Sequence, residues 1–145
     1  MYVEWRWEWT FEILPQMLWA TLNTFLAAGV GYAIAAIVGI LFMLGQRTPY
    51  KIINIIIREI VEFIRSTPLL VQLFFVYFVA PQFGLTLSAW VSAMITIGLH
   101  YGTYLSEVYR GALEGVPKTQ WEACRALNFS TSYNYRKIIL PQAFP

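Results

Sequence analysis

The feature that most constrains this chain is where its charged residues fall. No Asp, Glu, Lys or Arg lies between Glu12 and Arg47, and none lies between Arg65 and Glu107. Both intervals exceed the ~20 predominantly apolar residues that a helix needs to cross a bilayer. Hydrophobic residues make up 58% of the chain and charged residues 12%, whereas a soluble domain has about 25% charged residues. The chain is therefore predicted to be an all-α protein that crosses a membrane more than once.

Three membrane segments follow from these intervals. Turn-forming residues at 81–85 divide the second interval into two hydrophobic runs. The predicted segments are residues 17–44, 52–79 and 87–106. The acidic leader before the first segment and the absence of a cleavage pattern argue against a signal peptide, so we expect this segment to be retained.

The basic residues predict the orientation of these segments. Arg47 and Lys51 lie between the first and second segments, and the loop around 81–86 has no charge. Five further basic residues follow the third segment, at Arg110, Lys118, Arg125, Arg136 and Lys137. Because Lys and Arg favour cytoplasmic loops, the N-terminus is predicted to lie outside. Residues 1–16, which include Trp5, Trp7 and Trp9, then form an outer-surface aromatic segment, with tryptophans as interfacial anchors rather than a ligand cage.

Small and polar residues recur every fourth position in the first and third segments. In the first, Ala27, Gly31, Ala35 and Gly39 give a smooth helix face that favours close helix packing. In the third, Ser88, Ser92 and Thr96 lead to His100 and Tyr104, beside a G-x-x-x-G pair at Gly98 and Gly102. A polar stripe in a membrane must face protein or water. It either lines a solute path or bonds to a neighbouring helix.

The second segment is predicted to be broken. Its first half carries charges that can pair along one side, Arg58 with Glu62 and Glu62 with Arg65. Ser66, Thr67 and Pro68 then favour one helix ending and another beginning, with Ser or Thr as N-cap and proline in the first turn. Broken helices within a membrane often line cavities that bind solutes. The alternative is a simple proline kink that binds nothing.

The stretch 115–141 is predicted to be a helix, a turn and a second short helix on the cytoplasmic side. Pro117 can start the first helix, and Asn128 tolerates the left-handed conformation that follows a helix C-terminus. Pro141 is expected to stop or break the second helix. Such a paired arrangement is typical of a docking element.

This stretch resembles the EAA loop of ABC importer permeases, whose pattern is E-A-A, three residues, G, nine residues and I-x-L-P. The spacing agrees throughout, although Cys124 replaces the second alanine and Asn128 replaces the glycine. The resemblance implies that residues in this loop couple the chain to an ATPase. They are Glu122, Ala123, Cys124, Arg125, Leu127, Asn128, Ile138, Leu140 and Pro141.

Two upstream motifs strengthen the resemblance. Residues 62–72 resemble the E-F-x-R-x-T-P-L-L-x-Q signature of polar amino-acid permeases of the histidine/glutamine type, and residues 107–118 resemble the segment that leads into the EAA loop. The implied fold is the core of a type I ABC importer permease. Members usually have five core membrane helices, so residues 1–145 are expected to form a single transmembrane domain that holds three of the five and is C-terminally incomplete.

The resemblance also implies partners and cargo. A multi-pass subunit in the bacterial inner membrane would pair with a second, identical or homologous permease, a cytoplasmic ATPase dimer that binds the ATP, and an extracytoplasmic binding protein. The cargo would be a polar amino acid or an amino-acid-derived solute such as ectoine or hydroxyectoine, whose permeases the stretch 107–128 most resembles. The residues expected to line the path are Ser66, Thr67, Pro68, Gln72, Thr96, His100 and Tyr104.

Composition argues against other classes of function. With one Cys, one His and no Asp, a self-contained metal site is not expected, and no phosphate-binding G-x-x-x-x-G-K-[ST] loop is present. We therefore expect neither catalysis nor a cofactor on this chain. The net charge of +2 is scattered, which argues against nucleic acid binding. A non-transporting membrane scaffold remains an alternative, but it gives no reason for the spacing of the elements from Glu122 to Pro141.

Overall fold

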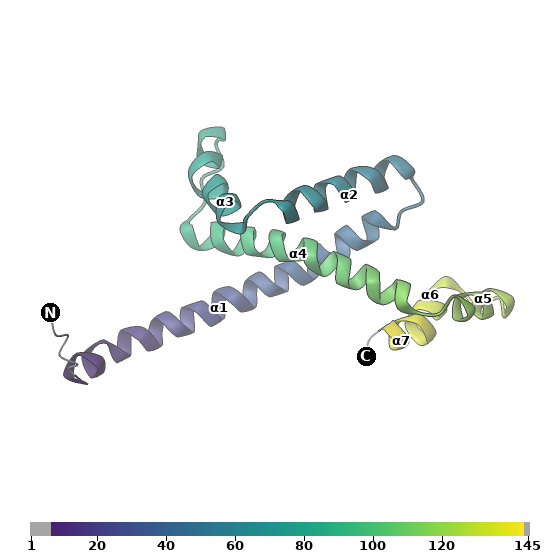
Figure 1. The fold of residues 1–145 in the computed structure, drawn as a ribbon, viewed down its shortest axis with the longest axis horizontal. Helices are drawn as coiled ribbons and strands as arrows, with labels where there is room; N and C mark the ends of the chain where they lie inside the picture. Colours follow the sequence, from purple (N-terminus) through teal and green to yellow (C-terminus); the bar gives the residue numbers. More distant parts are fainter. Residues whose placement is uncertain (1–6, 144–145) are drawn as a thin grey trace.

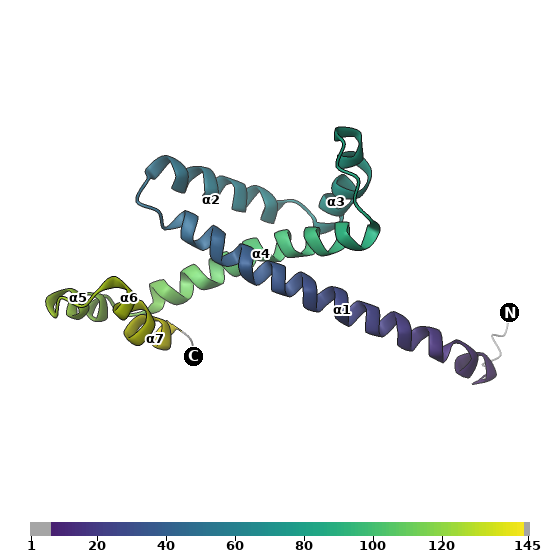
Figure 2. The ribbon, with the colours of Figure 1, turned by 180° about the vertical axis from the view of Figure 1, so that it is seen from behind.

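The computed structural model describes residues 7–143, and every element in that range is helical (Figure 1). The predicted all-α fold is thus confirmed. The chain forms two long crossing helices, a bent pair beside them and a cluster of short helices at one end. Figure 2 shows the same crossing from behind.

The crossing consists of α1 (Trp7–Gln46) and α4 (Ala89–Gly115). At 40 residues, α1 is about 60 Å long. It begins ten positions before the predicted residue 17 and includes Pro15, so residues 7–16 of the aromatic segment are its first turns. Trp7 and Trp9 are exposed there, whereas Trp5 lies outside the described residues. Pro15 lies inside α1, two turns after Trp7, where it removes one backbone hydrogen bond, and the helix continues through it.

Glycines from both helices allow the crossing to be close. A Cβ atom added at Gly98 would lie 2.4 Å from Ile34, and one added at Gly102 would lie 2.7 Å from Val38. Gly31 and Gly39 meet Ile97 and Leu105 in the same way. Together with buried Ala35, these residues show that the stripe predicted from spacing is the packing face of α1.

The second element is broken, as predicted. Helix α2 (Lys51–Ser66) is followed by α3 (Leu69–Phe74), and α2 is bent by 101° from the helical run Leu69–Phe83 that α3 begins. A π-helical turn (Phe75–Val79) and a 3-10 turn (Ala80–Phe83) complete it. Gly84, with φ +84°, adopts the left-handed conformation that ends this run before α4.

The elbow, as we name residues 113–143, ends the described chain. It contains α5 (Lys118–Ala126), α6 (Thr131–Tyr133), a π-helical segment (Asn134–Ile139) and α7 (Leu140–Ala143). Its core is formed by Leu113, Val116 and Ile139, with Met43 of α1 packed against it. The elbow is therefore anchored to the ends of both crossing helices (Figure 1).

Among the described residues, α1 alone is long and apolar enough to cross a membrane as a single helix. Helices α2 and α3 form a second span if they are counted as one broken element. Helix α4 covers the predicted third segment and continues to Gly115, but its Ser, Thr and His side chains make it less apolar. Its membrane crossing stays a prediction.

Candidate functional site

The outer surface of the elbow is formed by most of the predicted coupling residues. Glu122, Ala123 and Arg125 on α5 are exposed, and the Leu127 side chain that follows is 63% exposed. Cys124 is buried on the opposite side of the helix. The predicted coupling residues therefore divide into two groups: the Cys124 side chain is buried, whereas its neighbours are exposed and can contact another protein.

Asn128 builds the turn that ends α5. Its φ of +53° confirms the left-handed conformation predicted from sequence. The Asn128 N–H donates to the Arg125 carbonyl at 3.0 Å, and the Phe129 N–H donates to the Cys124 carbonyl at 3.1 Å. These two bonds form a Schellman motif, which satisfies carbonyls left open at the helix end. The turn geometry thus accepts Asn in place of the glycine of the family pattern.

The second half of the elbow corrects one prediction. Pro141 does not stop the helix, because α7 runs through it to Ala143. The turn immediately before it is π-helical (Asn134–Ile139), and this wider turn accommodates a residue that lacks an N–H. Ile138 is half-buried beside the core, while Leu140 and Pro141 are exposed.

The break between α2 and α3 is held by side chains that bond to α2. The hydroxyls of Ser66 and Thr67 both donate to the Phe63 carbonyl, at 3.1 and 2.8 Å. They therefore close the end of α2 and do not cap α3, contrary to the prediction. Pro68 occupies the N-cap position of α3 rather than its first turn, because its fixed φ suits the extended residue that precedes a helix.

Gln72 also acts on the break. Its side-chain amide donates to the Ile64 carbonyl at 2.7 Å and to the Thr67 carbonyl at 2.9 Å. Backbone carbonyls exposed by a broken helix must find such partners when water is absent. Gln72 therefore stabilises the bend. Its amide protons are used in these two hydrogen bonds and are not free to contact a solute.

The polar stripe of α4 is buried. Ser92, Thr96 and His100 are each at most 8% exposed, whereas Ser88 and Tyr104 at its ends are exposed. The Thr96 hydroxyl donates to the Ser92 carbonyl of its own helix at 2.7 Å. This bond satisfies the hydroxyl without either a solute or a neighbouring helix. The His100 Nδ1 atom is buried without a partner.

The break and the polar stripe meet through aromatic contacts. The Arg65 guanidinium lies over the Tyr104 ring, 5.1 Å from its centroid, and the Tyr104 hydroxyl is 3.5 Å from the Arg65 carbonyl. The His100 ring lies 5.3 Å from the Tyr104 ring. The structure thus brings the side chains of Arg65, His100 and Tyr104 together at the end of α2.

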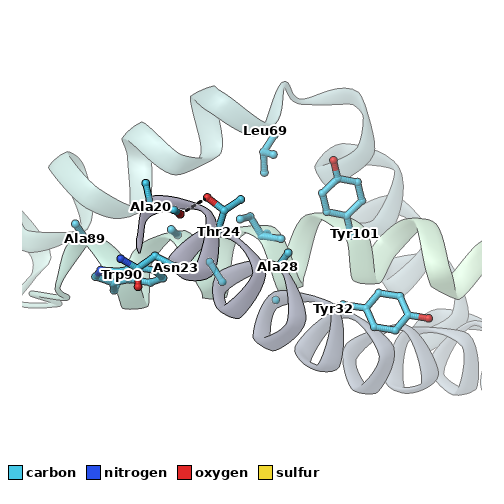
Figure 3. Close-up of a pocket in the computed structure, with 13 residues that line it drawn as sticks. Ala20, Asn23, Thr24, Ala28, Tyr32, Leu69, Ala89, Trp90 and Tyr101 are labelled. Atoms are coloured by element: carbon cyan, nitrogen blue, oxygen red, sulfur yellow. Dashed lines mark hydrogen bonds between the residues drawn. The ribbon is translucent and has the colours of Figure 1, made fainter. Parts of the chain in front are cut away.

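A wider cavity lies elsewhere. It has a volume of about 970 Å³ and is lined mainly by small or apolar side chains of α1, α3 and α4 (Figure 3). Its lining includes the polar or amphipathic side chains of Asn23, Thr24, Tyr32, Trp90 and Tyr101, and the Thr24 hydroxyl donates to the Ala20 carbonyl. None of the seven predicted path residues lines it.

A charged network beside a smaller cavity of about 310 Å³ was not predicted. Gln46 at the end of α1 donates to Glu107 of α4 at 3.0 Å, and Arg110 donates to the second oxygen of Glu107 at 2.6 Å. Arg110 also pairs with Glu114 at 2.8 Å. The i,i+3 and i,i+4 spacing of Glu107, Arg110 and Glu114 could have predicted their ion pairs from sequence. No sequence pattern pairs Gln46 with Glu107.

Comparison with known proteins extends this description. The family described as binding-protein-dependent transport system inner membrane component matches residues 31–145. The probable amino-acid ABC transporter permease protein y4tG of Sinorhizobium fredii is 37% identical over 136 residues, and the L-cystine transport system permease protein TcyB of Bacillus subtilis is 32% identical over 143 residues. Each comparison covers 92% of this chain but only 58% and 59% of the relatives, so the chain spans less than two thirds of their length.

Solved structures share the arrangement of helices. The crystal structure of an amino acid ABC transporter with histidines matches 99% of this chain and 66% of its own, with a TM-score of 0.75 and 26% identity. The MetNI methionine ABC transporter in inward facing conformations gives a TM-score of 0.60 at 24% identity, covering 87% of this chain and 60% of that one, and supports the fold alone. Because the family match includes the crossing, the break and the elbow, this chain belongs to the family of binding-protein-dependent transport system inner membrane components.

Proposed function

We propose that this chain is a permease subunit of an ABC importer for amino acids or amino-acid derivatives in the bacterial inner membrane. The names of its relatives support this class of transporter. The observation that carries the proposal is the elbow, whose exposed α5 surface (Glu122, Ala123, Leu127) stands on a buried core. A membrane scaffold would not need such a surface at this position.

The exposed side of α5 is the proposed contact with a separate ATPase. Leu127 offers an apolar side chain, and Glu122 and Arg125 offer charges, so the surface can form both a buried centre and a polar rim. Trp121 of α5 packs against the core of Leu113, Val116 and Ile139, to which α4 contributes Leu113, and Met43 of α1 packs against the same core. A force applied to α5 would therefore reach both crossing helices as a rigid-body movement.

The proposed path for the solute follows the broken helix and α4, and a second permease completes it. Discontinuous helices often line the solute path of transporters. The cluster of Arg65, Tyr104 and His100 offers cationic, phenolic and imidazole groups next to the break. His100→Ala is expected to reduce uptake while the protein still accumulates in the membrane. Unchanged uptake kinetics would remove His100 from the path.

The narrower proposal for the cargo is ectoine or hydroxyectoine, which rests on the sequence resemblance of residues 107–128 alone. The relatives are described as permeases for amino acids, L-cystine and nopaline. Competition of uptake by ectoine, glutamine, histidine and cystine, with the cognate binding protein present, would separate these cargoes.

The docking proposal is tested by Ala123→Trp in the complete importer, reconstituted with its ATPase and binding protein. A bulky ring on the exposed face of α5 is expected to abolish solute uptake and to weaken retention of the ATPase, without affecting membrane insertion. Val108→Trp is the matched control, since Val108 is exposed on α4 outside the elbow. Wild-type uptake by Ala123→Trp would contradict the docking role of α5.

A further inference from the structure

The network that joins α1 to α4 is centred on Gln46 and Glu107. Gln46 is only 3% exposed, and its side-chain amide donates to Glu107 while Arg110 holds the other carboxylate oxygen. Hydrogen bonds to a charged group are stronger than those between neutral groups, and exclusion of water strengthens them further. These three residues therefore fix the end of α1 against α4.

Helix α2 is attached to this network mainly by polar groups. Its one buried residue is Val61, and its exposed residues include Ile52, Ile56 and Phe63. The Asn54 side chain donates to the backbone carbonyl of Gln46, so the start of α2 is tied to the same residue that holds Glu107. Because α2 buries few apolar side chains, this bond contributes to holding its position.

One acceptor in the network and one donor beside it have no partner. Arg65 Nε and Gln46 Oε1 are both buried without partners, and both residues line the cavity of about 310 Å³. Buried polar groups in native proteins almost always have partners, so such groups call for an explanation. A movement of α2 toward α4 would close the cavity and bring Arg65 to the Gln46 and Glu107 side chains.

The elbow packs on both sides of this network. Met43, one turn before Gln46, contacts the elbow core, and Leu113 follows Arg110 by one turn. Movement of the elbow must therefore displace the segments that carry Gln46 and Glu107. Helix α2, tied to Gln46, ends at the break and would move with them.

We propose that Gln46 and Glu107 are positioning residues that transmit movement of the elbow to α2 and so set the bend at residues 66–68. This inference rests on the proposed function, because it assumes that an ATPase moves the elbow. It assigns the network no contact with the solute. Its role is to keep ATP hydrolysis linked to the opening of the path.

The first test measures solute uptake and ATP hydrolysis together in proteoliposomes that contain the complete importer, with a radiolabelled amino-acid mixture and ectoine as probes. Glu107→Gln keeps the size of the side chain but removes its charge. Uptake per ATP hydrolysed is expected to fall about tenfold, as for the loss of about 1.4 kcal/mol, while the ATPase rate changes by less than about twofold. Glu114→Gln is the matched control, since Glu114 pairs with Arg110 but makes no bond to Gln46.

A merely structural role predicts a different result. If Glu107→Gln lowers uptake and ATP hydrolysis in parallel, or behaves like Glu114→Gln, the proposal is wrong. Gln46→Leu keeps a side chain of similar volume but removes the bond to Glu107. It should reproduce the effect of Glu107→Gln. Failure of the parent protein to retain any ATPase would instead contradict the proposed function.

The second test measures movement directly. Spin labels at Ile56→Cys on α2 and Thr119→Cys on α5, in a Cys124→Ser background, report the distance between the two helices in the assembled importer. Addition of ATP is expected to shift this distance in the parent and in Glu114→Gln, but not in Glu107→Gln. The same shift in Glu107→Gln, or no shift in the parent, would overturn the inference.

Discussion

The crossing of α1 with α4 and the core of the elbow involve the same two helices but use different side chains. At the crossing, Gly31, Gly39, Gly98 and Gly102 let the backbones approach. In the elbow, Leu113, Val116 and Ile139 fill the space between helices. Helix α4 contributes Leu113 to the elbow core, and Met43 of α1 packs against that core.

The difference follows from the solvent that each region is expected to face. Lipid tails are as apolar as a leucine side chain, so helices in a membrane gain little by burying large apolar groups and instead gain dispersion energy from close contact. An element in water gains stability by burying larger side chains. Substitutions that change side-chain volume should therefore act in opposite directions in the two regions.

The largest effect is expected from enlarging the crossing. In Gly98→Leu, even the Cβ atom would lie 2.4 Å from Ile34, so α1 and α4 must separate. We expect the protein to be lost from the membrane fraction, as measured by immunoblot. Gly29→Ala is the control, since nothing lies within 4 Å of a Cβ atom there. Normal accumulation of Gly98→Leu would show that the crossing does not need close approach.

The next effect is expected from emptying the elbow core. Ile139 is fully buried, so Ile139→Ala should leave a cavity and destabilise the elbow by about 3 kcal/mol. Limited proteolysis of the complete importer should then cut residues 117–143 faster, while α1 and α4 stay protected. Ile138→Ala, at a half-buried position, should have a smaller effect. Equal cleavage of wild type and Ile139→Ala would contradict a packed elbow.

A smaller effect is expected at the turn after α5. Ala tolerates the left-handed conformation poorly, so Asn128→Ala should cost about 1 kcal/mol, whereas Asn128→Gly should be neutral or stabilising. Thermal unfolding of the purified importer, monitored by the amount of ATPase that stays bound, would measure the difference in stability between the two variants. If alanine and glycine had equal effects, the Schellman geometry would not contribute to stability.

The smallest effect is expected at the cap of α6. The Ser130 hydroxyl accepts a hydrogen bond from the Tyr133 N–H at 3.3 Å, which is long. Ser130→Ala should cost about 0.5 kcal/mol, the low end for N-caps, because the bond is exposed. The same unfolding measurement should barely separate this variant from wild type. A loss as large as that of Ile139→Ala would show that the cap organises the elbow.

Local features of the fold could be predicted from sequence because they depend on neighbouring residues. The break at residues 66–68 follows from proline and the residues before it, and the turn at Asn128 follows from backbone preference. The roles of Gln72, Ser66 and Thr67 could not be predicted, since their partners depend on how the broken ends face each other. The bond between Gln46 and Glu107 required the crossing itself.

The sequence by itself determined that this chain is helical and apolar, where its second element breaks, and which stretch carries the exposed elbow. These properties depend on composition and on spacing along one helix, which the chain carries before it folds. The tertiary structure decided which polar groups meet, because Gln46, Arg65 and Glu107 are far apart in sequence and only the angle at which α1, α2 and α4 pack brings them to one cavity.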